Sequence, residues 1–137
     1  MQVKLAVLAD FASISREGKI NIMGIFDEIN PQRLPIMLPI FYVVVSYSTD
    51  AVEFDTEKNV EIALQDEDGQ ILVRVHQTMR VPRPSRPGTR GIVNQVHALV
   101  NLPFQSLGNY EFVISVDGRP EGHIPLRINA PIEEGAT

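Results

Sequence analysis

The chain has 137 residues, a net charge of −5, 44% apolar residues and no cysteine. This length suits a single domain that buries a hydrophobic core of its own. The absence of cysteine excludes disulfides, thiolate catalysis and Cys-ligated zinc or iron–sulfur sites. The negative charge argues against bulk attraction to nucleic acid or to an anionic membrane surface.

No apolar run approaches the ~20 residues that a membrane-spanning helix needs. The run at residues 5–9 is too short for a signal peptide, and Asp10 interrupts it. We therefore expect a cytoplasmic protein without membrane association. We expect one domain over residues 1–129 and a flexible C-terminal tail over residues 130–137.

Alternation of apolar and polar residues predicts the first strands. In the first strand, the residues expected to face the core are Val3, Leu5, Val7, Ala9 and Phe11. A turn at Gly18 leads into a second strand over 20–26. Prolines within 30–39 exclude a helix there and indicate an extended crossover. The nearly continuous apolar run over 40–47 predicts a central strand covered on both faces.

The middle of the chain predicts a hairpin, with strands over 60–65 and 71–76 around an acidic turn. A four-residue loop would place Ile62 opposite Val73, on the core face. The same register would place Glu61 opposite Arg74, so the apolar and charged pairings agree.

A seventh strand follows a connection rich in proline and arginine over 80–90. Its expected core-facing residues are Val96, Ala98, Val100 and Leu102. The last two strands, over 110–116 and 124–128, form a C-terminal hairpin. Short strands with two long crossovers predict an all-β fold, an antiparallel β-sandwich of about eight strands. The expected path is Greek-key and immunoglobulin-like.

The segment Gly108-Asn109-Tyr110-Glu111-Phe112, preceded by Leu102-Pro103-Phe104, resembles a corner of immunoglobulin-like sandwiches. In those folds a tyrosine near the start of a strand bonds back to the preceding corner. The resemblance implies the same bond for Tyr110. The inter-sheet cysteine pair and the core tryptophan of antibody domains are absent, which excludes a true antibody-type domain.

The N-terminal third, with Leu8-Ala9-Asp10-Phe11-Ala12 followed by the segment from Gly18 to Asp27, is similar to a family of small uncharacterised prokaryotic proteins. Those chains open in this way and end in a Gly-x-Tyr-x-Phe segment. The resemblance covers nearly the whole chain. It implies a domain of unknown function and transfers no functional residue.

No catalytic or metal-binding motif occurs in the sequence. His76, His97 and His123 fall on the parity expected to face outward, without the spacing of a metal site. The acidic turn at 66–69 lacks the alternating ligands and distal glutamate of a calcium loop. There is neither a nucleophile elbow nor a phosphate-binding loop. We therefore assign no catalytic residue, metal or cofactor.

The charge pattern suggests one binding surface. Eight acids and one lysine occur over 50–68, and five arginines and no acid over 74–90. The candidate binding loop contains Arg80, Arg83, Arg86 and Arg90, held extended by prolines to capture an acidic protein. The alternative is internal pairing of the two blocks. Nucleic acid is a poorer partner, because no aromatic residues interleave the arginines.

A second candidate surface is apolar. Six residues on the parity opposite the expected core face form the candidate self-association face: Leu8, Met23, Ile25, Val44, Leu99 and Val113. Gathered on one sheet, they would form a patch too large to leave in water. The alternatives are a crossover folded over them, or single residues scattered along edges.

The sequence thus favours a non-enzymatic protein-binding or scaffold module that acts through a surface patch and can associate with itself. The alternative is a small-ligand-binding protein or hydrolase with its site at the sheet ends. An enzyme requires a concave pocket with converging titratable groups. A scaffold requires a flat apolar or basic patch.

Overall fold

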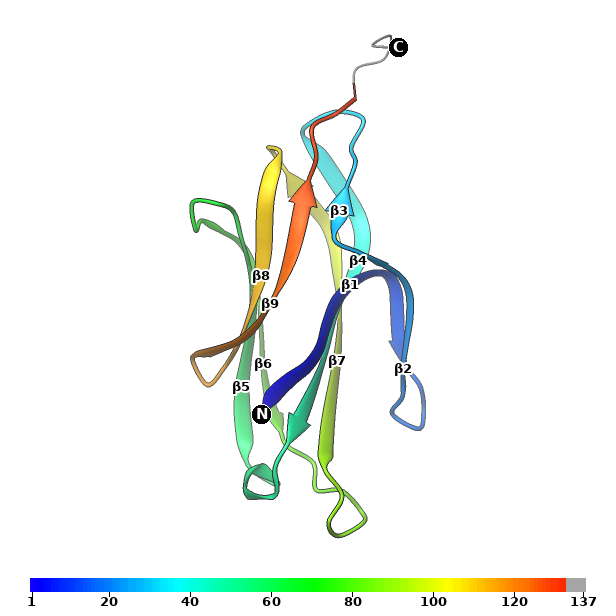
Figure 1. Cartoon of the computed structure of the whole chain (residues 1–137), viewed down its shortest axis with the longest axis vertical. Coiled ribbons are helices and arrows are strands. Elements are labelled where there is room, and N and C mark those ends of the chain that lie inside the picture. Colours follow the sequence, from blue (N-terminus) through cyan, green and yellow to red (C-terminus); the bar gives the residue numbers. More distant parts are fainter. Residues whose placement is uncertain (133–137) are drawn as a thin grey trace.

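A computed structural model describes residues 1–132 as two β-sheets packed face to face (Figure 1). The elements are β1 (Gln2–Ile14), β2 (Ile20–Phe26), β3 (Glu28–Ile29), β4 (Ile36–Thr49), the short 3-10 helix η1 (Ala51–Glu53), β5 (Glu57–Gln65), β6 (Ile71–Arg80), β7 (Gly91–Phe104), β8 (Gly108–Val116) and β9 (Arg119–Ile128). The four-stranded sheet has the order β2-β1-β4-β7, and the five-stranded sheet has the order β3-β9-β8-β5-β6. The predicted β-sandwich is confirmed, with nine strands rather than eight.

The longest ladder joins β4 to β7, from Ile36 opposite Phe104 to Thr49 opposite Gly91. Both strands begin earlier than the sequence predicts, so the crossover expected over 30–39 is shorter than its prolines suggest. Pro39 has no backbone N–H to donate, but the β4–β7 ladder is not interrupted by this, because Pro39 and Asn101 are not among its paired residues. Residues 130–132 of the predicted tail have no regular structure, and the rest of that tail lies outside the described residues.

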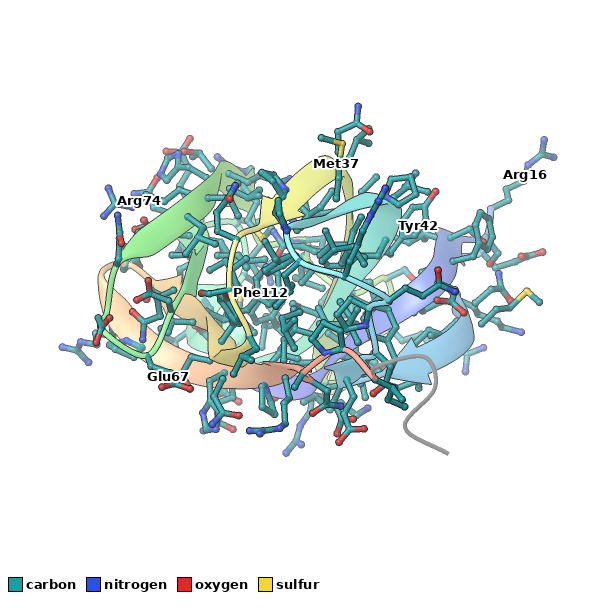
Figure 2. All side chains as sticks on the ribbon, turned by 90° about the horizontal axis from the view of Figure 1, so that it is seen from above. Arg16, Met37, Tyr42, Glu67, Arg74 and Phe112 are labelled. Atoms are coloured by element: carbon teal, nitrogen blue, oxygen red, sulfur yellow. The ribbon has the colours of Figure 1, made fainter. Side chains whose placement is uncertain are left out.

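Three phenylalanines connect the two sheets through the core. Phe41 of β4 meets Phe112 of β8 across the gap, with ring centroids 6.2 Å apart, and meets Phe26 of β2 at 5.9 Å. Both contacts are edge-to-face, the arrangement that aromatic rings favour. Phe112 lies between the sheets in Figure 2, and both Phe41 and Phe112 are buried.

The corner before β8 is closed by Tyr110. Its hydroxyl donates a hydrogen bond of 2.6 Å to the carbonyl oxygen of Ser106. Its ring packs edge-on against Phe104, with centroids 5.1 Å apart. The back-bonding tyrosine implied by the resemblance is therefore present, and it ties the end of β7 to the start of β8.

The predicted facing of β1 and β7 is wrong in part. In β1 a register shift between Val3 and Leu5 changes the parity, so Leu8 faces the core. In β7, Asn101 has a φ of 54°. Leu99 and Leu102 lie on either side of it and both face the core, although residues three apart in a regular strand face opposite sides. Alternation reports side-chain direction only while the backbone stays regular, and either irregularity reverses it.

In the β5–β6 hairpin the side chains face the predicted sides, but the two strands pair in a different register from the predicted one. Ile62 lies opposite Val75 rather than Val73, because Leu64 and Gln65 form an irregular step beside the turn. A shift of two residues keeps each side chain on its face. The predicted attraction between Glu61 and Arg74 survives as a diagonal ion pair of 3.1 Å.

The β1–β2 hairpin leaves the plane of the four-stranded sheet and lies on the side away from the five-stranded sheet (Figures 1 and 2). Its turn contacts β7, because the Asn94 side-chain amide donates 3.0 Å to the carbonyl oxygen of Gly18. The strands bend where Asp10 passes Gly24, which has a φ of 72° and no room for a Cβ. The hairpin thereby covers Val44, which points away from the core yet is 0% exposed.

The aromatic contact between the sheets predicts a large stability loss for Phe112→Ala. Removing this buried ring should lower the free energy of unfolding by ~3–5 kcal/mol, through lost burial and a residual cavity. Urea denaturation followed by circular dichroism measures the loss. Val113→Ala is the matched control, because Val113 lies on the other face of β8 and is partly exposed. A loss below about 1 kcal/mol for Phe112→Ala would contradict the core assignment.

Candidate functional site

An apolar patch lies on the outside of the four-stranded sheet and its hairpin. Its members are Phe11, Met23, Ile25, Ile40 and Val100, which we call the apolar patch; their exposed fractions run from 47% at Phe11 to 65% at Met23. Phe11 lies opposite Met23, and Ile40 lies opposite Val100. Tyr42 joins the two groups, since its ring meets Phe11 edge-on at 5.4 Å.

The structure leaves two of the six residues of the candidate self-association face mostly exposed. Met23 and Ile25 are exposed as predicted, at 65% and 62%. Leu8 and Leu99 are wrong, because the parity changes in β1 and β7 turn both into the core. Val44 points outward beneath the hairpin, which shields it from solvent.

Val113 lies on the outer face of the five-stranded sheet, on the opposite side of the sandwich from Met23 and Ile25. Three members of the patch are not predicted by the sequence pattern. Phe11 was assigned to the core of the first strand, and Val100 to the core of the seventh. Ile40 opened a strand that was expected to be covered on both faces. No feature of the sequence marks the step between Val3 and Leu5 as a point where facing changes, and at Asn101 the one signal is that asparagine tolerates a positive φ.

The candidate binding loop lies at the lower end of the molecule in Figure 1, beside η1. Arg83 is paired within the chain, since its guanidinium donates twice to one carboxylate oxygen of Asp55, at 2.9 and 2.8 Å. It also lies 5.8 Å from the ring centroid of Phe54. Within residues 1–132, Arg80, Arg86 and Arg90 form no ion pair. The internal pairing of the acidic and basic blocks is thus real but partial.

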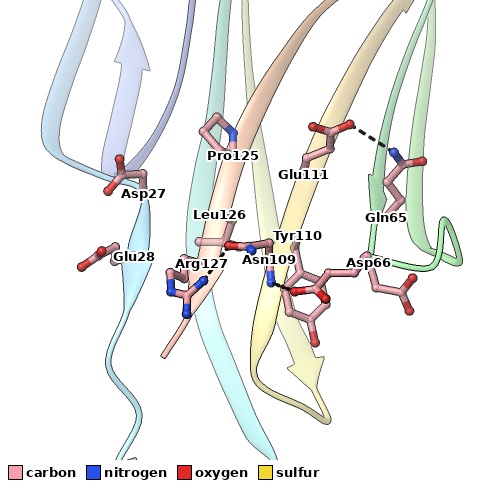
Figure 3. Close-up of a pocket in the computed structure, with 11 residues that line it drawn as sticks. Asp27, Glu28, Gln65, Asp66, Asn109, Tyr110, Glu111, Pro125, Leu126 and Arg127 are labelled. Carbon is pink, nitrogen blue, oxygen red and sulfur yellow. Dashed lines mark hydrogen bonds between the residues drawn. The ribbon is translucent and has the colours of Figure 1, made fainter. Parts of the chain in front are cut away.

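A shallow depression of about 490 Å³ lies on the outer face of the five-stranded sheet, beside β3 (Figure 3). Its polar floor is fixed by internal hydrogen bonds. The Arg127 guanidinium donates 2.9 Å to the side-chain oxygen of Asn109, whose backbone N–H donates 2.7 Å to Glu67. The Gln65 amide donates 3.2 Å to Glu111.

This depression is acidic and carries no catalytic constellation. The carboxylates around it belong to Asp27, Glu28, Asp66, Glu67 and Glu111, and the one cation among the lining residues is Arg127. Within the part of the chain that the structure describes, no three His, Asp or Glu side chains are grouped as metal ligands. Its polar groups are largely engaged with one another, which leaves few of them to orient a substrate.

The three histidines lie apart, on different strands. His76 of β6 and His123 of β9 are exposed as predicted. His97 corrects the prediction: it lies opposite Val43, on the core side of β7, and its Nε2 has no hydrogen-bond partner. Burial lowers the pKa of His97, because the interior disfavours the charged imidazolium.

A short polar chain runs beside His97, between the open edges of the two sheets. The buried Tyr47 hydroxyl donates 2.7 Å to Gln95, and the Gln95 amide donates 3.2 Å to Gln77 of β6. Burial raises the pKa of Tyr47 well above its ordinary value. These groups satisfy one another, as buried polar atoms must, and they fix the spacing of β7 and β6.

Comparison with protein families decides the chain's membership. The family described as of unknown function, DUF6941, matches residues 4–129. The chain belongs to DUF6941. The match spans all nine strands, so the sandwich is the DUF6941 domain, and the expectation of an uncharacterised domain is confirmed. Comparison with curated proteins gives no match. Within residues 1–132, no helix has the length and apolar character to cross a membrane.

The half-buried His97 predicts that the DUF6941 domain loses stability on mild acidification. Because its folded pKa lies below the unfolded value of about 6.5, the unfolded chain binds the extra proton first. Stability should be full above pH 6.5 and should fall as the pH drops below it, by at most ~1.4 kcal/mol per unit. Urea midpoints at pH 7.5 and 5.5 measure this slope.

His97→Gln should flatten that slope, since glutamine does not titrate. His123→Gln is the matched control, because His123 is exposed and should leave the slope unchanged. A slope that persists in His97→Gln would assign the acid sensitivity to other groups.

Proposed function

We propose that this DUF6941 protein is a non-enzymatic binding or scaffold module that acts through the apolar patch and associates with itself. The observation that supports this proposal is the exposure of five large apolar side chains on strands of the four-stranded sheet. Apolar patches of several hundred Å² on a folded protein mark interaction surfaces.

The size of the patch suits association with a partner. A half-exposed large apolar side chain presents about 100 Å² to water, so five present roughly 500 Å². A standard interface buries about 800 Å² on each partner, including a polar rim. The apolar patch and its border therefore have the area that one such contact needs.

We also propose kinship with immunoglobulin-like sandwiches. In those folds strands A, B and E share one sheet, while C, F and G share the other. The order β1-β4-β7 against β9-β8-β5-β6 follows this arrangement, with β6 as a C′ strand. The Tyr110 corner at the start of β8 agrees with it. Many domains with this architecture bind proteins, but fold alone does not assign a function.

The competing function is a small-ligand carrier or hydrolase that uses the depression beside β3. Its support is the presence of a concave surface with five carboxylates. Against it stand the shallow form and the internal pairing of Arg127 and Asn109. The apolar patch therefore supports a binding module better than this depression supports catalysis.

The proposed self-association predicts that the protein is at least a dimer at tens of micromolar, measured by light scattering. Ile25→Lys should weaken the association about tenfold or more, since a lysine must then be desolvated in the contact. Val52→Lys is the matched control, because Val52 is 84% exposed on η1, outside the patch. A strictly monomeric wild-type protein would remove the self-association proposal.

The basic loop makes a separate prediction. Replacing Arg83, Arg86 and Arg90 by serine should change the free energy of unfolding by less than about 1 kcal/mol, because the Arg83–Asp55 pair is exposed. The same variant should lose any binding of polyglutamate at low salt, measured by fluorescence anisotropy. Arg16→Ser is the control, and unchanged binding by the triple variant would retire the loop as a binding surface.

A further inference from the structure

The edge strand β2 carries neither charge nor proline between Ile20 and Phe26 to keep it from pairing with other chains, although the backbone bends at Gly24. Natural edge strands are commonly protected by lysine, proline, short length or a covering segment. Met23 and Ile25, the most exposed members of the apolar patch, both lie on this strand.

Both edges of the five-stranded sheet are protected. Strand β6 carries Arg74 and Arg80, and β3 has only two residues. Strand β7, the other edge of the four-stranded sheet, also lacks Lys, Arg, Asp and Glu, and the hydrogen bond from Gln95 to Gln77 ties it to β6. Among the strands of residues 1–132, β2 and β7 are thus the two uncharged edges, and β2 carries the more exposed apolar side chains, Met23 and Ile25.

The charges at the two ends of β2 are opposite. The turn before it carries Arg16, Glu17 and Lys19, a balance of +1, and the residues after it are Asp27 and Glu28, a balance of −2. None of these five groups forms an ion pair with the described residues. An antiparallel neighbour with the same sequence would bring each basic end beside an acidic end.

We propose that two copies of this chain join through antiparallel pairing of their β2 strands, which extends the four-stranded sheet across a two-fold axis. Antiparallel pairing of a strand with itself is self-complementary, as a two-fold dimer requires. The uncharged centre of β2 faces its own copy, and the charged ends complement one another. The inference rests on the proposed self-association and names the strand that makes it.

The first test uses charge reversal and mixing. Arg16→Glu/Lys19→Glu places acidic groups at both ends of the pair, and Asp27→Lys/Glu28→Lys places basic groups there. Each double variant alone should dimerise about tenfold more weakly, because like charges face each other. An equimolar mixture should recover wild-type affinity, since the two variants complement each other. Sedimentation velocity measures both results.

The mixture separates pairing at β2 from a general effect of net charge. Recovery in the mixture supports antiparallel pairing of the two strands. If the mixture stays as weak as the separate variants, or if neither variant weakens the dimer, the β2 assignment is overturned.

The second test distinguishes edge pairing from packing through the sheet face. Edge pairing adds backbone hydrogen bonds, so amide hydrogen exchange in 20–26 should slow as concentration rises and the dimer fills. Val52→Lys should leave that protection unchanged, because Val52 lies on η1, outside the patch and away from the β2 edge. Met23→Lys should abolish it.

The outcomes separate the two proposals. A monomeric wild-type protein removes the self-association proposal and the β2 inference together, and an extended peptide of another protein would then be the partner to seek at this edge. A dimer without slowed exchange in β2, or one whose protection in β2 survives Met23→Lys, keeps the proposed self-association and overturns edge pairing.

Discussion

The contact of Phe41 with Phe112 holds the sandwich together at its centre. Each ring comes from the middle of its sheet, one from β4 and the other from β8. In this cysteine-free chain an aromatic contact takes that central position, so packing rather than a covalent bond sets the distance between the sheets.

Much of the rest follows from that spacing. Phe26 of β2 meets Phe41 edge-on. Two residues before Phe26, Gly24 has a positive φ, and a Cβ there would collide with Asp10. The hairpin then closes over Val44 and leaves its own outer side exposed. The same bend that covers one apolar surface therefore creates another, which is where the proposed function resides.

Sequence periodicity was sufficient for the strands and the fold class, because alternation in short segments depends on local geometry. It was insufficient for the absolute facing of β1 and β7. One irregular residue, such as Asn101 with its positive φ, reverses every inference beyond it. Met23 and Ile25 could be predicted because β2 keeps its parity, whereas Leu8 and Leu99 could not.

The burial of Val44 could not be predicted from the sequence either, because it depends on a hairpin that folds over its own sheet. The candidate site was therefore predicted in kind, an apolar surface, but only partly in its residues. For the depression beside β3, the sequence signal is stronger than the structural one. Its acidic residues are conspicuous in the sequence, yet in the structure Glu67 and Glu111 are engaged by neighbouring polar groups.

The tyrosine corner and the buried phenol of Tyr47 also determine how the molecule can be observed. The chain has no tryptophan, so its intrinsic fluorescence comes from three tyrosines. Tyr110 donates to Ser106 at one end of the sandwich, while Tyr47 donates to Gln95 between the sheets. Hydrogen bonding of a phenol to an amide or carbonyl oxygen alters its emission, and Tyr42 emits from beside the apolar patch. The protein thus carries built-in optical reporters of its corner, its interior and its exposed side.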